Sequence, residues 1–210
     1  MAERRRLLSF DVGLRHLAFC DITVGTGDDP AAGATVHRWE VVDVTGPRAT
    51  KKKAGIDETT EALLLALDAR FSEAGGPTYD VVLIENQPAC KNPMMKSVQM
   101  VLYTYFQVMR LYAGNVGAVR LVSATRKLSM RHVPAVISPA DAPVISTAPA
   151  LAPTQAAAYR ERKLAAVRLC RHYLDEVMHD AASTAQLSAS RKKDDLCDCM
   201  LQALWFAERK

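Results

Sequence analysis

The stretch that most constrains the fold of this chain begins at Leu7, where an apolar run leads into a single carboxylate, Asp11. A glycine follows two residues later, and a second apolar run covers residues 17–24. Two short runs of β-forming residues separated by a turn-like segment predict an antiparallel hairpin. Asp11 then falls inside the first strand, where an ionised side chain is costly unless it is paired or binds a metal ion. An isolated aspartate of this kind is more often a turn or capping residue, so its role depends on the rest of the chain.

The rest of the sequence predicts an α/β fold with one mixed sheet. After the hairpin, the hydrophobic pattern predicts further strands over residues 36–44, 80–85 and 118–122, and helices over residues 57–75, 94–112, 155–178 and 192–209. Three antiparallel strands followed by a β-α-β-α-β order give a five-stranded mixed sheet with helices on both faces. A chain of 210 residues suits a single domain, residues 1–210.

Apolar residues at helical spacing mark the sides of these helices that we expect to be buried. They are Leu63, Leu64, Leu67, Phe71, Met95, Val98, Leu102, Tyr105, Met109, Tyr112, Tyr159, Leu164, Val167, Tyr173 and Leu174. The regular seam from Met95 to Tyr112 suits either the core or a helix-to-helix contact in a dimer. Residues 134–153 hold five prolines without a helical period and predict a flexible Pro/Ala-rich insertion. The polar segment before the last helix is interpreted as a connection.

Composition excludes several classes of protein. An apolar content of 49% indicates a folded globular chain, and no apolar run approaches the roughly 20 residues of a membrane span. The N-terminus lacks the pattern of a signal peptide. Five cysteines show neither the density of a disulfide framework nor zinc-ligand spacing, and we expect Cys197 as a small apolar position and Cys199 at the surface. Free thiols predict a reducing compartment, the cytoplasm or the nucleus, and we expect a cytoplasmic protein.

The distribution of charge points to a polyanionic partner. The formal net charge is only +4, but the basic residues gather in short runs. These runs are Arg4–Arg6, Lys51–Lys53, Arg126–Lys127 with Arg131, Arg160–Lys163 and Arg191–Lys193. Each run alone is typical of a solvated surface, whereas several together in a chain with an acidic site favour nucleic acid.

The last expected helix carries acidic residues at a significant spacing. Asp195 and Asp198 lie on one side of it, and so do Asp194 and Asp198. Like charges at this spacing repel each other, although acidic residues in a first turn also suit the helix dipole, which leaves N-terminal capping as an alternative explanation. Together with Asp11 and Glu85, at the end of the fourth expected strand, they supply carboxylate oxygens. Hard divalent cations prefer such ligands, and two ions roughly 3.5–4 Å apart can stabilise both the attacking and the leaving oxygen of a phosphodiester.

Three motifs resemble those of the ribonuclease H-like superfamily, and within it the RuvC-type Holliday-junction resolvases of the poxvirus and mitochondrial branch. They are Ser9–Gly13 (SFDVG), Leu83–Gln87 (LIENQ) and Lys192–Asp198 (KKDDLCD). The resemblance extends over most of the chain, from about residue 7 to residue 206. It implies a homodimeric endonuclease that depends on Mg²⁺ or Mn²⁺, with two ions per active site, and makes paired nicks in four-way DNA junctions.

The resemblance also implies the catalytic residues. Asp11, Glu85, Asp195 and Asp198 match the metal ligands, and spacing does not separate Asp194 from Asp195. Expected DNA contacts are Lys91, Lys96, Arg126, Lys127, Arg131, Arg191, Lys192 and Lys193. The 134–153 insertion has no counterpart in the family pattern. An Ala- and Arg-rich sequence suits a large DNA virus, such as a poxvirus, whose concatemeric genome would be the substrate in the host cytoplasm.

Three other functions share part of this pattern. A sugar-kinase or actin-like ATPase repeats its Asp-x-Gly hairpin in two domains, whereas Asp-x-Gly occurs here only at Asp11. Another ribonuclease H-like nuclease, acting on RNA–DNA hybrids or in transposition, would use the same acidic residues, so only its substrate distinguishes it. A non-catalytic DNA-binding protein of this fold is disfavoured, because a bare acidic cluster destabilises a protein that binds no metal.

Overall fold

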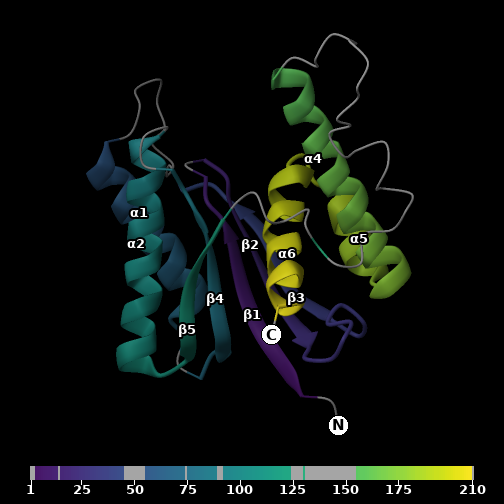
Figure 1. Ribbon diagram of the computed structural model, residues 1–210. Coiled ribbons are helices and arrows are strands. Elements are labelled where there is room, and N and C mark those ends of the chain that lie inside the picture. The colour runs from purple at the N-terminus through teal and green to yellow at the C-terminus, as the bar shows by residue number, and fades with distance from the viewer. Residues whose placement is uncertain are drawn as a thin grey trace.

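A five-stranded mixed sheet lies at the centre of the structure, a computed structural model that describes residues 3–13, 15–44, 55–73, 75–88, 92–123, 130 and 155–209 (Figure 1). The strands are β1 (Arg4–Asp11), β2 (Leu17–Gly25), β3 (Thr35–Val42), β4 (Tyr79–Asn86) and β5 (Val116–Ser123). Their order in the sheet is β3-β2-β1-β4-β5. The β1–β2 and β2–β3 pairs are antiparallel, while β1–β4 and β4–β5 are parallel. The predicted mixed α/β sheet is therefore confirmed.

The β1–β2 hairpin follows from the alternation of its side chains. Leu8 and Phe10 point into the core on one face of the sheet, and Leu7 points into the core on the other. Gly13 is required in the turn, because a Cβ atom there would lie 2.5 Å from the carbonyl oxygen of His16. The hairpin thus brings Asp11 to the end of a strand that is covered on both faces.

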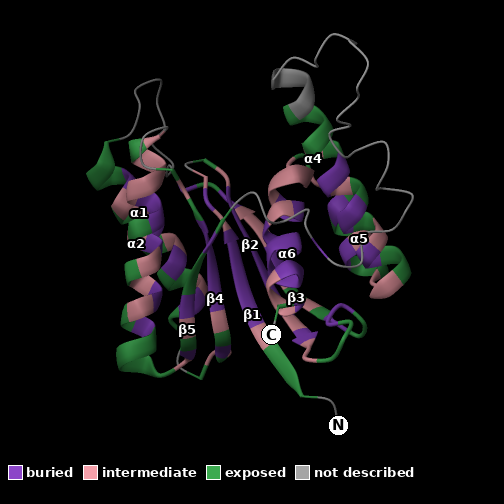
Figure 2. Cartoon of the chain, viewed as in Figure 1, coloured by how far each residue is buried: buried purple, intermediate pink, exposed green. Residues whose placement is uncertain are grey.

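Helices cover both faces of the sheet (Figures 1 and 2). One face carries α1 (Ile56–Phe71) and α2 (Pro93–Val108), which continues into the π-helical turn η1 (Met109–Ala113). The other face carries the last part of the chain: α4 (Gln155–His172), the π-turn η3 (Tyr173–Val177), α5 (Ala181–Ala189) and α6 (Lys193–Ala207). Among these, α6 lies directly on the sheet and α4 packs outside it.

The core under α1 and α2 is aromatic. Phe10, Phe19, Phe71 and Phe106 form a cluster in which neighbouring ring centroids lie 5.3 to 6.0 Å apart. Several of these pairs are tilted or edge-to-face, which is a favourable arrangement for aromatic rings. All four side chains are buried.

The core under α6 is built from smaller and sulfur-containing side chains. Cys20, Cys197 and Met200 are buried here, and the Cys170 Sγ atom of α4 lies 3.5 Å from the Met200 Sδ atom. Cys199, expected at the surface, is completely buried. The expectation was wrong because α6 is enclosed by the sheet on one side and by α4 and α5 on the other, so it has no free surface at this position.

Two predicted core positions of the first helical layer are exposed. The buried side of α1 contains Leu63 and Leu67, and Leu64 points away from it with 39% exposure. In the second helix the π-turn η1 interrupts the 3.6-residue period, so Tyr112 leaves the predicted seam and is 85% exposed.

Sequence patterns were also misleading in the last third of the chain. Tyr159 and Leu164 of α4 are more than half exposed, because the buried side of α4 is made by small residues such as Ala165 and Ala166. The segment predicted as a polar connection contains helix α5, whose N-cap Asp180 accepts a hydrogen bond from the Ser183 backbone N–H. The predicted 134–153 insertion lies outside the described residues. None of the described helices is both long and apolar enough to cross a bilayer.

Candidate active site

Asp11 and Glu85 end two neighbouring parallel strands. The β1–β4 register pairs Phe10 with Ile84, so the next residue on each strand, Asp11 and Glu85, stand side by side. Their side chains share the face of Leu83, which packs beneath α6, because alternate residues of a strand point to one face. Glu85 is only 8% exposed and Asp11 is partly buried. Two carboxylates thus meet at one edge of the sheet, under the last helix.

Helix α6 is fixed over this edge by two hydrogen bonds from Gln202. Its side-chain amide donates to the Ser9 hydroxyl at 3.0 Å and to the Phe10 carbonyl at 3.2 Å. A third bond anchors the first turns of the helix, where the Trp39 indole N–H donates to the Leu196 carbonyl at 2.9 Å. The helix runs against the direction of β1, so its N-terminal half lies toward the end of β1 (Figure 1).

The acidic residues of α6 differ in the direction in which they point. At 3.6 residues per turn, Asp195 lies roughly 20° and Asp198 roughly 40° from the direction of Gln202, which contacts β1. Asp194 lies roughly 80° away from it. Asp195 and Asp198 therefore face the sheet edge that carries Asp11, and Asp194 is turned aside from it.

Asp194 pairs with Lys163 of helix α4. The Lys163 ammonium donates a hydrogen bond to its carboxylate. Burial by itself would raise the pKa of Asp194, but the hydrogen bond and charge of Lys163, together with a backbone hydrogen bond and the charge of Lys192, hold the pKa of this carboxyl below its usual value. Asp194 thereby links α4 to the first turn of α6.

Asp195 lies in a different electrostatic environment. Burial raises its pKa, and the neighbouring charge of Asp194 acts in the same direction. Lys192, whose Nζ atom lies 4.0 Å from the Asp195 carboxylate, partly offsets this effect. His16, in the β1–β2 turn, also lowers the pKa of Asp195, which shows that the helix and the turn approach each other. Both acids of the first turn also suit the helix dipole, an explanation that does not extend to Asp198 in the second turn.

Lys96 is a basic residue whose side chain lies at the end of β4. It donates to the side-chain oxygens of Asn86 at 3.0 Å and Gln99 at 3.1 Å. Gln99 is fully buried and also accepts a hydrogen bond of 2.7 Å from the Gln87 backbone N–H. These bonds hold the ammonium next to the strand end occupied by Glu85.

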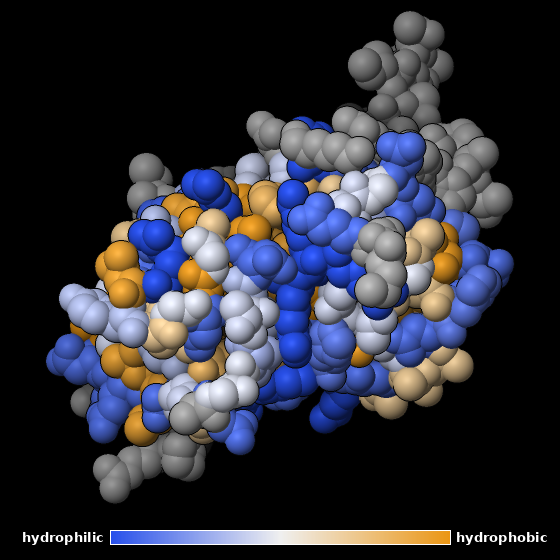
Figure 3. All heavy atoms as spheres, turned by 90° about the horizontal axis from the view of Figure 1, so that it is seen from below, coloured by the Kyte–Doolittle hydropathy of each residue, from blue (hydrophilic) through white to orange (hydrophobic). Residues whose placement is uncertain are grey.

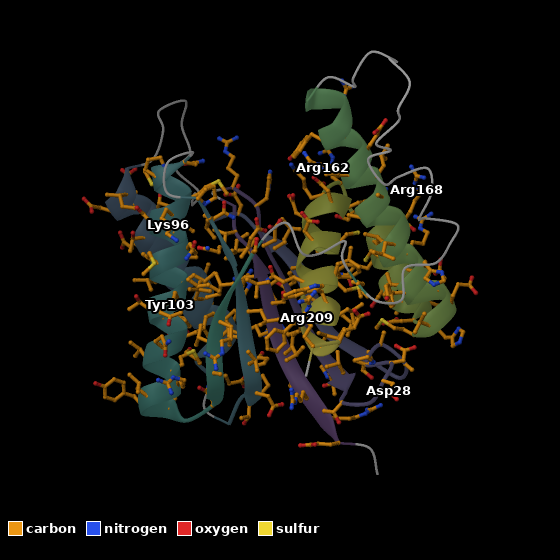
Figure 4. All side chains as sticks on the ribbon, viewed as in Figure 1. Asp28, Lys96, Tyr103, Arg162, Arg168 and Arg209 are labelled. Carbon is orange, nitrogen blue, oxygen red and sulfur yellow. The ribbon has the colours of Figure 1, made fainter. Side chains whose placement is uncertain are left out.

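Other predicted DNA contacts surround the same end of the molecule. Arg191, Lys192 and Lys193 lie at the start of α6, directly before the acidic residues. In the upper half of Figure 4, Lys96 lies on α2 at one side of the sheet and Arg162 lies on α4 at the other side. The remaining predicted contacts lie outside the described residues; they are Lys91, Arg126, Lys127 and Arg131.

The four acidic residues carry the type of ligand atom that a divalent cation prefers. Carboxylate oxygens are the ligands that Mg²⁺ and Mn²⁺ prefer. Among the residues that the structure describes, however, no three His, Cys, Asp or Glu side chains are arranged as a metal site. Strand register and helix direction thus bring the acids to one edge without gathering them into a closed cluster.

Three residues near the acids were not singled out from the sequence. Lys163 belongs to a basic run 31 residues before Asp194, and only the packing of α4 on α6 reveals the pair. Gln202 is a polar residue in an otherwise apolar stretch of its helix, four residues after Asp198. This interruption of the apolar stretch was the sequence signal that could have identified it. His16 lies in the β1–β2 turn, and the fold brings it near Asp195 although no motif in the sequence marks it.

Comparison with solved structures shows that the fold is one found in Holliday-junction resolvases. The yeast mitochondrial Holliday-junction resolvase aligns with a TM-score of 0.59 and 14% identity, over 97% of this chain and 79% of that chain. Fowlpox virus resolvase in complex with its substrate junction DNA gives 0.53 and 16%, over 97% of both chains. RuvC of Thermus thermophilus, in complex with a Holliday-junction substrate, gives 0.51 and 15%, over 97% of this chain and 93% of that chain.

The likeness is one of three-dimensional structure. The sequence matches no protein-family model and none of the curated proteins. The resolvase fold implied by the three short motifs is nevertheless confirmed over almost the whole chain.

Proposed function

We propose that this protein is a structure-selective DNA endonuclease that resolves four-way junctions by paired, metal-dependent phosphodiester hydrolysis. One observation carries the proposal: Asp11 and Glu85 end adjacent parallel strands beneath a helix whose Asp195 and Asp198 face the same edge. The fold shared with junction resolvases supports this reading of the edge.

Asp11, Glu85, Asp195 and Asp198 are the proposed metal ligands. They would hold Mg²⁺ or Mn²⁺, two ions per active site, which when bound activate water and neutralise charge on the phosphodiester. Asp195 is preferred to Asp194, because Asp194 is turned away and engaged by Lys163. The residues of this chain contribute the rest: Gln202 orients α6, and Lys96 presents a positive charge beside Glu85.

The proposed DNA surface follows the basic residues around the acids. Lys96, Arg191, Lys192 and Lys193 border the edge, and the predicted contacts Lys91, Arg126, Lys127 and Arg131 complete the set. Their contacts would be to phosphate, because lysine and arginine bind the backbone through charge and thus position DNA without reading its sequence. Cleavage at a junction would then depend on the shape of the DNA.

A homodimer would allow paired nicks, but the predicted seam is not its contact surface. Val98, Leu102 and Met109 are buried against the sheet and belong to the core. The exposed apolar side chains on α2 and η1 are Tyr112, the last residue of that seam, and three residues outside it, Met100, Val108 and Leu111. We assign the dimer contact to this set. A dimer by light scattering at micromolar concentration, converted to a monomer by Leu111→Glu, would support the assignment, and a wild-type monomer would contradict it.

The proposed biological substrate is replicated, concatemeric genome DNA of a large virus in the host cytoplasm. The Ala- and Arg-rich composition and the free thiols of the four described cysteines support that setting.

The decisive experiment compares three labelled substrates: a four-way DNA junction, a linear DNA duplex and an RNA–DNA hybrid. Each is incubated with Mg²⁺ or EDTA, and with wild-type or Glu85→Gln protein. Metal-dependent paired nicks in the junction alone, lost in the variant while junction binding persists, are expected. Preferential cleavage of the hybrid would show that the protein is another kind of ribonuclease H-like nuclease, one that acts on RNA–DNA hybrids. Failure of folded protein to cleave any of them would leave a non-catalytic DNA-binding protein.

A further inference from the structure

A second concave site lies at the end of the sheet opposite the acidic edge. It is a pocket of about 530 Å³ where α1 and η1 end and where β4 and β5 begin. Its position follows from the topology: both helices precede parallel strands, so both end where those strands start. Figure 3 views this end of the molecule, and the side formed by α1 and η1 shows hydrophilic and apolar residues intermixed.

The wall of this pocket is electronegative. Its described lining contains two exposed carboxylates, Asp68 and Glu73, and no described lysine, arginine or histidine. Helix α1 ends at Phe71, and the π-turn ends at the left-handed cap Gly114. Each helix C-terminus carries a partial charge of roughly −0.5, because its last carbonyl groups lack helical partners. Two carboxylates and two helix ends thus point to a positively charged ligand.

Acceptor and aromatic groups line the interior. The Asn115 Oδ1 atom is buried and has no hydrogen-bond partner among the described residues, which is rare for a polar atom. Phe71, Tyr105 and Met109 supply aromatic and thioether surface. Burial, followed by the charge of Asp68, raises the pKa of Tyr105 to about 12, in agreement with the closeness of these two side chains. A cation with an apolar stem would contact rings, sulfur and carboxylates together.

We propose that this pocket binds an organic cation, an alkylammonium or guanidinium group, at a site separate from the nuclease edge. A bare metal ion fits less well, since the described residues here provide no third carboxylate or imidazole. The volume matches a small organic ligand, for which pockets of roughly 300–1,000 Å³ are usual. Two sources share this chemistry: a free polyamine and a basic side chain of another protein.

The glycines of the pocket allow a direct test. Gly75, Gly76 and Gly114 line it, and their amide signals can be followed by NMR in the full-length protein. Gly25 and Gly27, at the end of β2, serve as internal references. Spermidine and N-acetyl-arginine amide are titrated separately, without DNA or metal. Saturable shifts confined to the pocket glycines are expected; spermidine alone would identify a free polyamine, and the arginine derivative alone a protein side chain.

Charge-matched variants separate specific binding from general attraction. Asp68→Asn combined with Glu73→Gln should weaken binding about tenfold, the loss expected for two partly exposed ion pairs. The control is Glu61→Gln with Glu176→Gln, which changes the net charge equally on exposed helical positions outside the pocket. The proposal is overturned if neither probe shifts the pocket glycines, or if the control weakens binding as much as the pocket variant. Retention of junction cleavage in the pocket variant would confirm that the two sites are separate.

Discussion

The two faces of the sheet differ in the interactions that hold their helices in place. Under α1 and α2, large aromatic rings fill most of the space, and the polar bonds of Gln99 lie at the first turns of α2. Under α6, small side chains and thiols let the helix come close to the sheet, and polar bonds from Gln202 and Trp39 fix its position.

Because of this difference, one face contributes mainly to the stability of the fold, and the other positions the acidic residues. A purely apolar layer supplies burial energy but leaves the exact placement of a helix to packing alone. Hydrogen bonds between buried partners are directional, so they set where a helix carrying functional groups must lie. The face with Gln202 is thus the one on which the acidic residues are placed, and the aromatic face supports the sheet beneath them.

Replacement of the buried acid should give the largest functional effect. Glu85→Gln is expected to reduce junction cleavage at least about a thousandfold, because several kcal/mol of transition-state stabilisation are lost with a metal ligand. Its free energy of unfolding should stay the same or increase, since a buried charge is removed. Single-turnover cleavage and urea denaturation measure the two quantities. Large losses in both would assign Glu85 to the stability of the fold.

The aromatic face should respond in the opposite way. Phe106→Ala creates a cavity among four rings and is expected to lower the free energy of unfolding by about 3–5 kcal/mol. At a temperature where the variant is folded, its cleavage rate should be close to that of the wild type. Urea denaturation followed by circular dichroism measures the first effect. A cleavage rate that falls in the fully folded variant would break the proposed separation of the two faces.

The two adjacent acids of α6 should be unequal. Asp195→Asn is expected to reduce cleavage about a hundredfold, whereas Asp194→Asn, which frees only Lys163, should change it several-fold at most. Metal-dependent cleavage is compared at equal protein stability. If instead Asp195→Asn retains most activity while Asp194→Asn abolishes it, then Asp194 is the ligand.

The smallest effect is expected from the bond that orients α6. Gln202→Met keeps the size of the side chain but removes the donations to Ser9 and Phe10, at a cost of about 1–2 kcal/mol of stability. The cleavage rate should fall about tenfold because α6 and its acidic residues are displaced, while junction binding is retained. Gln202→Glu offers a comparison that restores acceptors but not the donor. Full activity in both variants would show that α6 is positioned without this residue.

Most of the sheet could be predicted because local patterns determine it. The Leu7–Asp11 run, the apolar strand ending in Glu85 and the interruption at Gly13 all fall where the structure has them. The acidic pair on α6 was also recognisable from its spacing, since helical geometry alone puts Asp195 and Asp198 on one side.

The remaining features depend on contacts between distant residues. Tyr112 was placed in a seam because nothing in the sequence marks the π-turn before it. Cys199 looks like a surface position until α4 covers α6. The choice between Asp194 and Asp195 likewise requires Lys163, whose position relative to α6 no local pattern contains.

The bond between Gln202 and Ser9 joins residues 193 positions apart in the chain. Strand β1 and helix α6 therefore meet only after all the residues between them have been synthesised. Contacts of such long range form late and slow down folding. A nascent chain can complete its aromatic layer on the ribosome, but it cannot assemble the acidic edge, because α6 has yet to emerge. The nuclease that we propose would thus remain inactive until α6 has emerged and has packed on the sheet.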